Sequence, residues 1–160
     1  MRVRTWVKRF CRNCRMSLKD RPFREFIPEE IREVELDIIR NDQVKYFEKD
    51  LQSLRKSLNL SHKSTIIKMN PELDHEGILR SASRLVNAEM LPIQMRKPII
   101  LHKKSWVTLL IIRSAHLERD HCAGVSHLQS DLTQRFWIQC ARKLIKRVES
   151  QCIFYQEQRA

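Results

Sequence analysis

The feature that most constrains the fold is a pair of histidines, His116 and His121, followed far downstream by Cys152. Histidine nitrogen and cysteine sulfur are preferred zinc ligands, and two histidines ahead of a distant cysteine is the ligand order of a small helical zinc-binding domain. The fourth ligand would be expected three residues after Cys152, and that position is occupied by Tyr155. A phenol is a poor zinc ligand. The sequence therefore predicts a zinc site of three ligands, with Tyr155 standing in the fourth position.

The same residues also have an interpretation without metal. His116 would then be a core histidine, His121 a loop histidine and Cys152 a small core residue. If metal does bind, Cys122, Cys140 or a water molecule could supply the fourth bond, and the sequence does not choose among them. From spacing alone the metal-bound and metal-free interpretations carry equal weight, because sets of histidine and cysteine also arise by chance.

Composition and charge narrow the class of protein. Hydrophobic residues make up 42% of the chain and only two residues are glycine, which favours a packed, helix-rich body. The 31 Lys and Arg against 19 Asp and Glu leave a formal charge of +12, which indicates a polyanionic partner such as nucleic acid. Bases dominate residues 1–24 and 135–160, but acids dominate residues 25–60. This distribution argues against one continuous nucleic-acid-binding surface.

Cysteine usage and apolar runs bear on the compartment. Five cysteines, an odd number without a recognisable secretion signal, favour a reducing intracellular setting with thiols or metal ligands. The pair Cys11 and Cys14 has the C-x-x-C spacing, but no second pair or nearby histidine accompanies it, so chance is its better explanation. No apolar run approaches the length that spans a membrane, and no membrane partner is expected.

Apolar spacing predicts an α+β fold that is mostly α. Trp6, Phe10 and Cys14 recur on one face of a short basic helix. A second helix is predicted to begin at Pro28, and a third helical segment to end near Lys56. We interpret the second and third as a helical hairpin. Together these segments form a predicted N-terminal unit over residues 1–60, with a polar linker over residues 61–77.

Residues 78–160 are predicted to form the zinc-binding-type domain. Residues 78–85 and 98–101 favour a small β-hairpin, which leads into three helices. Ser105 is expected to cap the first helix, and Gly124 to precede the second. The residues expected on the inward faces of the three helices are Leu109, Ile112 and His116; Leu128, Leu132 and Phe136; and Ala141, Leu144, Ile145, Val148 and Cys152.

The last predicted helix also carries four bases away from its apolar stripe. They are candidates for contact with DNA phosphates, although any one of them is equally well explained as part of a solvated helix face. These bases are Arg142, Lys143, Lys146 and Arg147.

The order of several segments resembles one known family. The segments include WVKRF (6–10), PEEI (28–31), NPELDHEGILR (70–80), RL (84–85), KPIIL (97–101), LIIRSAH (110–116), AGV (123–125), RFWI (135–138), KRV (146–148) and RA (159–160). Their order and spacing resemble the integrase zinc-binding domain, with its upstream linker, in polyproteins of BEL/Pao-type retrotransposons. The resemblance covers essentially the whole chain.

This resemblance implies a site with two histidines and two cysteines. His116, His121 and Cys152 match the first three zinc ligands, and Tyr155 stands where the family has its second cysteine. The implied role is non-catalytic: support of DNA binding and of integrase assembly during DNA integration in the nucleus. DNA and other integrase subunits are the implied partners, with no small-molecule substrate. The catalytic core of the family would begin after residue 160, so we expect a polyprotein fragment that is not an enzyme.

Departures from the family leave two other interpretations open. Tyr155 replaces a cysteine, Ser81 to Ser83 replaces a glycine pair, and one extra residue lies between His121 and Gly124. These departures are typical of a decayed element copy. The alternatives are therefore a decayed or host-retained helical interaction module without metal, and a metal-free basic protein that binds nucleic acid.

Overall fold

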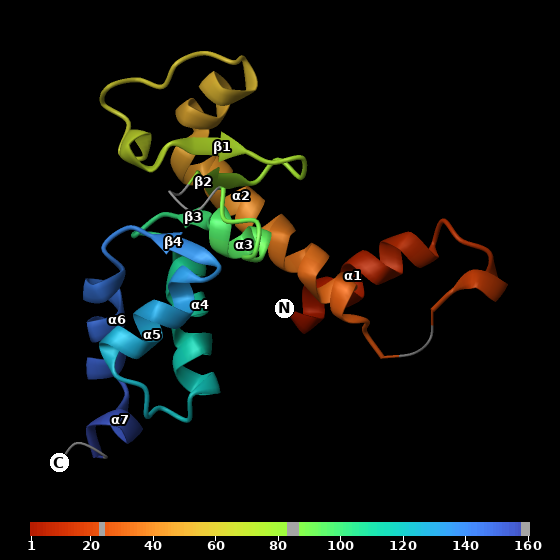
Figure 1. Cartoon of the computed structure of the whole chain (residues 1–160). Helices are drawn as coiled ribbons and strands as arrows, with labels where there is room; N and C mark the ends of the chain where they lie inside the picture. Colours follow the sequence, from red (N-terminus) through yellow and green to blue (C-terminus); the bar gives the residue numbers. More distant parts are fainter. Residues whose placement is uncertain (23–24, 83–86, 158–160) are drawn as a thin grey trace.

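The structure, a computed structural model, describes residues 1–22, 25–82 and 87–157 (Figure 1). Helices surround a small sheet, so the prediction of an α+β, mostly α fold is confirmed. The helices are α1 (Arg2–Asn13), α2 (Pro28–Arg55), α3 (Ile93–Arg96), α4 (Trp106–Glu118), α5 (Val125–Thr133), α6 (Ala141–Ser150) and α7 (Ile153–Glu157), with 3-10 turns η1 (Leu18–Asp20) and η2 (Ile67–Met69). The strands are β1 (Pro71–Leu73), β2 (Leu79–Ser81), β3 (Ile99–Leu101) and β4 (Phe136–Ile138).

The predicted helical hairpin after Pro28 is wrong, because α2 is a single helix of 28 residues. Its one interruption is at Phe47, where φ is −126° and ψ is 27°. No glycine or proline divides the segment, and Ile39, Gln43, Phe47 and Leu51 are all buried at four-residue spacing. One continuous buried stripe packs against the sheet more fully than two short helices would, so the helix continues.

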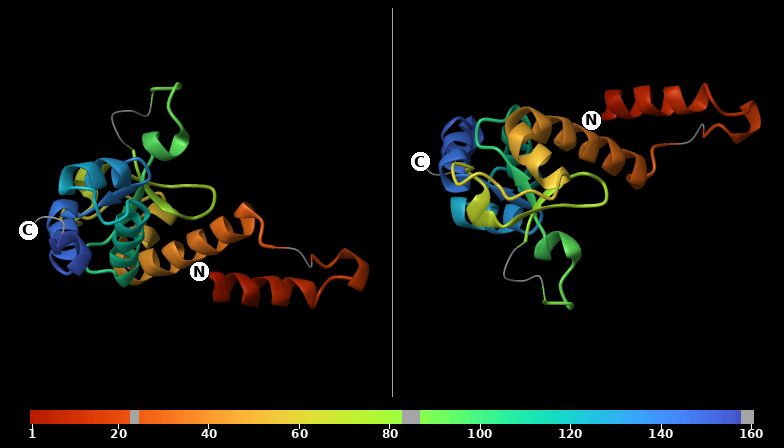
Figure 2. Two further views of the ribbon diagram at one scale, coloured as in Figure 1. Left: turned by 90° about the horizontal axis from the view of Figure 1, so that it is seen from below. Right: turned by 90° about the horizontal axis from the view of Figure 1, so that it is seen from above.

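Helix α1 packs beside the first half of α2 (Figure 2). The buried face of α1 is polar. Thr5 and Arg9 are buried, and the Nε of Arg9 donates to the Oε1 of Glu30 over 3.1 Å. The apolar face predicted around Trp6 and Phe10 exists, but both side chains are exposed. Ion pairs between the basic helix and the acidic helix therefore decide which face of α1 is covered.

The sheet has the order β1-β2-β3-β4. Strands β2 and β3 are antiparallel, with Arg80 opposite Ile99, which confirms the predicted pairing. Strand β1 lies inside the predicted linker 61–77 and pairs antiparallel with β2, so the end of that segment belongs to the sheet. The predicted strand residues 83–85, and the family-like residues 159–160, lie outside the described part of the chain.

Strand β4 corrects the predicted second helix of the C-terminal part. Helix α5 ends at Thr133, and Phe136 pairs with Ile99 in a parallel ladder between β4 and β3. The run Phe136–Ile138 is aromatic and β-branched with buried residues at both ends, a pattern that fits a strand better than a helix. Phe136 still enters the core as predicted, but from the sheet.

Helices α4, α5 and α6 pack together below the sheet in Figure 1, so three helices form as predicted. Ile112, Leu128 and Ile145, one from each helix, are fully buried in a shared cluster. Ser105 caps α4 as expected, because its Oγ accepts the N–H groups of Val107 (3.0 Å) and Thr108 (3.3 Å). Within the described residues, no helix is long and apolar enough to cross a membrane.

The buried amide of Gln43 joins α2 to the middle of the sheet. Its Nε2 donates to the carbonyl oxygens of Leu79 (2.9 Å) and Ile100 (2.8 Å), and its Oε1 accepts the N–H of Leu79 (2.8 Å). These bonds satisfy backbone groups on the two central strands. Gln43 therefore sets the position of α2 across the face of the sheet.

Candidate metal centre

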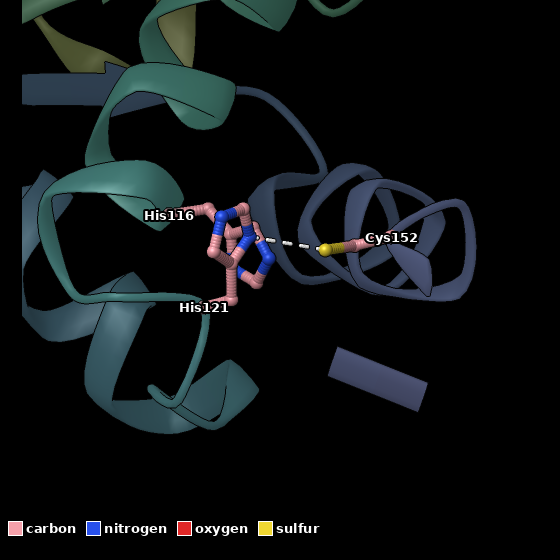
Figure 3. A group of neighbouring side chains, drawn as sticks. All are labelled: His116, His121 and Cys152. Atoms are coloured by element: carbon pink, nitrogen blue, oxygen red, sulfur yellow. Dashed lines mark hydrogen bonds between the residues drawn. The ribbon is translucent and has the colours of Figure 1, made fainter. Parts of the chain in front are cut away.

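The predicted metal ligands meet at one end of the three-helix group (Figure 3). His116 comes from the last turn of α4, His121 from the loop between α4 and α5, and Cys152 from the junction of α6 and α7. One ligand atom from each residue lies within 4.8 Å of the other two. The Nδ1 of His121 is 3.0 Å from the Sγ of Cys152. The structure thus assembles a cluster that could hold a metal ion.

The turn after α4 brings the two histidines together. Asp120 (φ 49°) and His121 (φ 61°) both adopt the left-handed conformation, and the N–H of His121 donates to the carbonyl of His116 over 3.2 Å. The imidazole rings then lie edge to face, with their centroids 5.0 Å apart. Left-handed backbone at non-glycine residues is uncommon and tends to occur at functional sites. Here its effect is to direct a second imidazole toward His116.

His116 is the buried member of the cluster, with 2% of its surface exposed. Neither of its ring nitrogens has a hydrogen-bond partner among the described residues. A buried polar atom left in this state costs about 1–3 kcal/mol, so a metal ion bound there would offset that cost. Burial, and after it the nearby His121 ring, lower the pKa of His116 from its usual 6.5, which keeps the imidazole in the neutral form that binds metals.

Two aromatic rings from α7 border the cluster. Tyr155 is 9% exposed, and its ring centroid lies 5.7 Å from that of His116 at an interplanar angle of 70°. The exposed Phe154 ring lies 5.2 Å from that of His121. Tyr155, predicted at the fourth position, is therefore beside the cluster and packs edge-on against the buried imidazole.

The other cysteines considered as a fourth ligand lie outside the cluster. Among the described residues, the group of candidate ligand atoms consists of those from His116, His121 and Cys152. The exposed thiol of Cys122 donates to the carbonyl oxygen of Asp120 over 3.1 Å. Cys140 is exposed at the start of α6. The protein donor set is thus two nitrogens and one sulfur.

The four bases predicted to contact phosphate are all exposed on α6. None of them belongs to the metal cluster. Arg142, Lys143 and Lys146 line a groove that also contains Trp137 of β4, whereas Arg147 does not line it. Sequence reasoning did not single out Trp137, because its exposure depends on β4 being a strand and not the end of a helix.

Comparisons of the chain with family models, curated proteins and solved structures found no match. The fold and the cluster define a mostly helical α+β protein with a candidate metal centre.

Proposed function

We propose that the chain is a non-catalytic zinc-binding domain that supports DNA binding and assembly, as in the retrotransposon integrase region that it resembles. The observation that carries this proposal is the convergence of His116, His121 and Cys152 from three separate segments. Convergence of that kind is what a structural metal site in a small helical domain requires.

Zinc suits this donor set. It binds imidazole nitrogen and thiolate sulfur at about 2.0–2.3 Å in a tetrahedron, which separates neighbouring ligand atoms by roughly 3.5 Å. The cluster spans 3.0 Å between His121 and Cys152 and no more than 4.8 Å overall, so small side-chain movements suffice. Because Tyr155 supplies a phenol in the fourth position, we propose that water completes the site and that affinity is lower than with four protein ligands.

The proposed role of the metal is to hold α4 and α6 together. His116 lies on α4, and Cys152 follows the end of α6, whose outer surface carries the bases proposed to contact DNA. Zinc bound at these residues would add folding free energy and fix the basic surface relative to the core. The metal would therefore stabilise the fold, and no reaction is assigned to the site.

Zinc stoichiometry tests the proposal. Full-length protein would be folded with zinc, dialysed and measured by native mass spectrometry. We expect one equivalent in the wild type, loss of zinc in Cys152→Ser, and tighter binding in Tyr155→Cys, which restores a thiolate. Cys140→Ser, which removes an exposed thiol outside the cluster, is the matched control and should retain zinc. Absence of one equivalent from both the wild type and Tyr155→Cys would overturn the metal assignment.

A second candidate function, nucleic-acid binding without metal, is favoured by the charge on α6. Among the described residues, none of its four exposed bases forms an ion pair (Arg142, Lys143, Lys146 and Arg147). Salt-dependent DNA binding that survives chelation would favour this function. If the protein binds neither zinc nor DNA, the interpretation that remains is a helical interaction module without metal.

A further inference from the structure

A groove beside α6 combines an exposed indole with cations. Its volume is about 570 Å³, within the range of small-ligand sites. Trp137 projects into it from β4 while its neighbours Phe136 and Ile138 are buried in the core. Its cationic lining is Arg142, Lys143 and Lys146, and its described lining includes no Asp or Glu.

These cations differ from three of the cations on the N-terminal helix. On α1, Lys8, Arg9 and Arg12 are neutralised by ion pairs with acids of α2. In the described part of the chain, Lys146 and its two groove neighbours form no ion pair. The positive charge of these three groove residues is therefore not compensated by an acid in the groove lining, and an anion can reach it.

Two of the cations occupy positions that are unfavourable for the helix itself. Arg142 and Lys143 lie in the first turn of α6, and that turn contains no acidic residue. The helix dipole favours negative charge at this end, so cations here lower helix stability. Local conflicts of this kind are expected at functional sites. A phosphate in the groove would be attracted both by the side chains and by the helix terminus.

Trp137 is suited to stacking. Its side chain is 42% exposed, and no cation–π pair involving it is found among the described residues, whereas Trp106 has the Arg113 guanidinium 5.7 Å from its ring centroid. Aromatic side chains stack on nucleobases whatever the sequence, because every base has a π face. In a duplex those faces are covered by the neighbouring base pairs. An aromatic ring among cations therefore matches an unpaired base with its flanking phosphates.

We infer that Trp137, Arg142, Lys143 and Lys146 form a binding groove for single-stranded nucleic acid. Trp137 stacks on an unpaired base and the three cations contact the adjacent phosphates. This inference rests on the nucleic-acid part of the proposed function, which it sharpens from DNA in general to an unpaired strand. It is independent of the metal, since none of the four side chains belongs to the metal cluster.

Binding of short fluorescent oligonucleotides to the full chain tests the inference. Anisotropy would be measured with single-stranded thymidine and uridine oligonucleotides and with a DNA duplex. We expect Trp137→Ala to weaken single-strand binding by about 5- to 150-fold, the effect of removing one stacked base, and to change duplex binding less than about 2-fold. Trp106→Ala, which removes another exposed indole, should leave both unchanged. A comparison of the thymidine and uridine oligonucleotides shows whether the groove prefers a DNA or an RNA strand.

A spectroscopic measurement guards against misfolding of the alanine variant. The chain has three tryptophans, and in a Trp6→Phe, Trp106→Phe protein only Trp137 remains. Its fluorescence should be quenched on addition of thymidine oligonucleotide. Unquenched fluorescence at saturation, or wild-type single-strand binding by Trp137→Ala, would overturn the inference while leaving the proposed function intact. Absence of salt-dependent binding to every oligonucleotide would overturn the nucleic-acid part of the proposed function as well.

Discussion

The Nδ1 atom of His121 lies 3.0 Å from the Sγ atom of Cys152, although 31 positions separate the two residues in sequence. The contact joins the loop after α4 to the end of α6, and the buried ring of His116 lies beside it. Two elements that meet through potential metal ligands have a stability that depends on what those ligands bind. The contribution of this cluster to stability without metal can therefore be measured separately from its contribution with metal bound.

Replacing His116 by leucine should have opposite effects with and without zinc. Without metal, leucine removes two buried nitrogens that have no hydrogen-bond partner among the described residues, so the free energy of unfolding should rise by about 1 kcal/mol. With zinc, the wild type should gain stability that the variant cannot. Urea denaturation with and without chelator measures both. His127→Leu, at an exposed position on α5, is the control. A metal-free variant less stable than the wild type would contradict the interpretation.

Gln43→Leu should destabilise the protein by about 3 kcal/mol. The substitution leaves two buried carbonyls and one N–H of the central strands without their side-chain partner, and such groups are costly to bury unpaired. Thermal or urea unfolding measures the decrease. Gln52→Leu, at an exposed position on the same helix, should change stability by no more than about 0.5 kcal/mol. Equal effects at the two positions would show that the Gln43 bonds contribute little.

Stability should fall in acid because of Glu30. Its hydrogen bond from Arg9 holds the pKa of the Glu30 carboxyl below 4.5, although burial acts in the opposite direction. A carboxyl with a lowered folded-state pKa stabilises the protein fully above its unfolded pKa, and that contribution is lost as the pH falls through the folded pKa. Unfolding free energies measured from about pH 5 down to about pH 3 should therefore decrease.

Two variants test whether the decrease in unfolding free energy with falling pH, the acid slope, arises from Glu30. Glu30→Gln should be less stable than the wild type at neutral pH, because it breaks the ion pair with Arg9, and should show a shallower acid slope. Glu33 lies on the same helix as Glu30 and forms an exposed ion pair with Lys8 of α1. Glu33→Gln should therefore retain most of the acid slope. If the two variants have the same slope, the dependence arises elsewhere.

Replacing Lys146 by glutamine should lower the salt dependence of single-strand binding. Removing one lysine–phosphate interaction reduces the slope of log K against log salt by about 0.7 on a single strand, because one fewer counterion is released on binding. Lys103→Gln, at an exposed position on the turn before α4, should leave the slope unchanged. Titrations at several salt concentrations provide the comparison. A slope unaffected by Lys146→Gln would show that this lysine does not contact a phosphate.

Local sequence signals predicted the elements that begin at a clear chemical boundary. Pro28 marks the start of α2, and Ser105 the start of α4, because the ring of proline and the hydroxyl of serine act on backbone groups only a few residues away. The helical hairpin was wrong for a complementary reason. No local signal distinguishes a continuous helix from two segments when the deciding interaction is a buried stripe on a distant sheet.

The sequence by itself determined the helix-rich class, the burial of His116 and the candidate ligand set, since these follow from apolar periodicity and from ligand chemistry. Only the tertiary structure decided that α1 buries its polar face, that Phe136 enters the core from a strand, and that Trp137 lies beside the bases of α6. The first two outcomes depend on partners far away in the chain, the acids of α2 and the edge of β3. The third depends on the same pairing of β4 with β3, which places Trp137 in a strand beside α6. The short distance between His121 and Cys152 was also decided by the tertiary structure, because it depends on how α4 and α6 pack against each other.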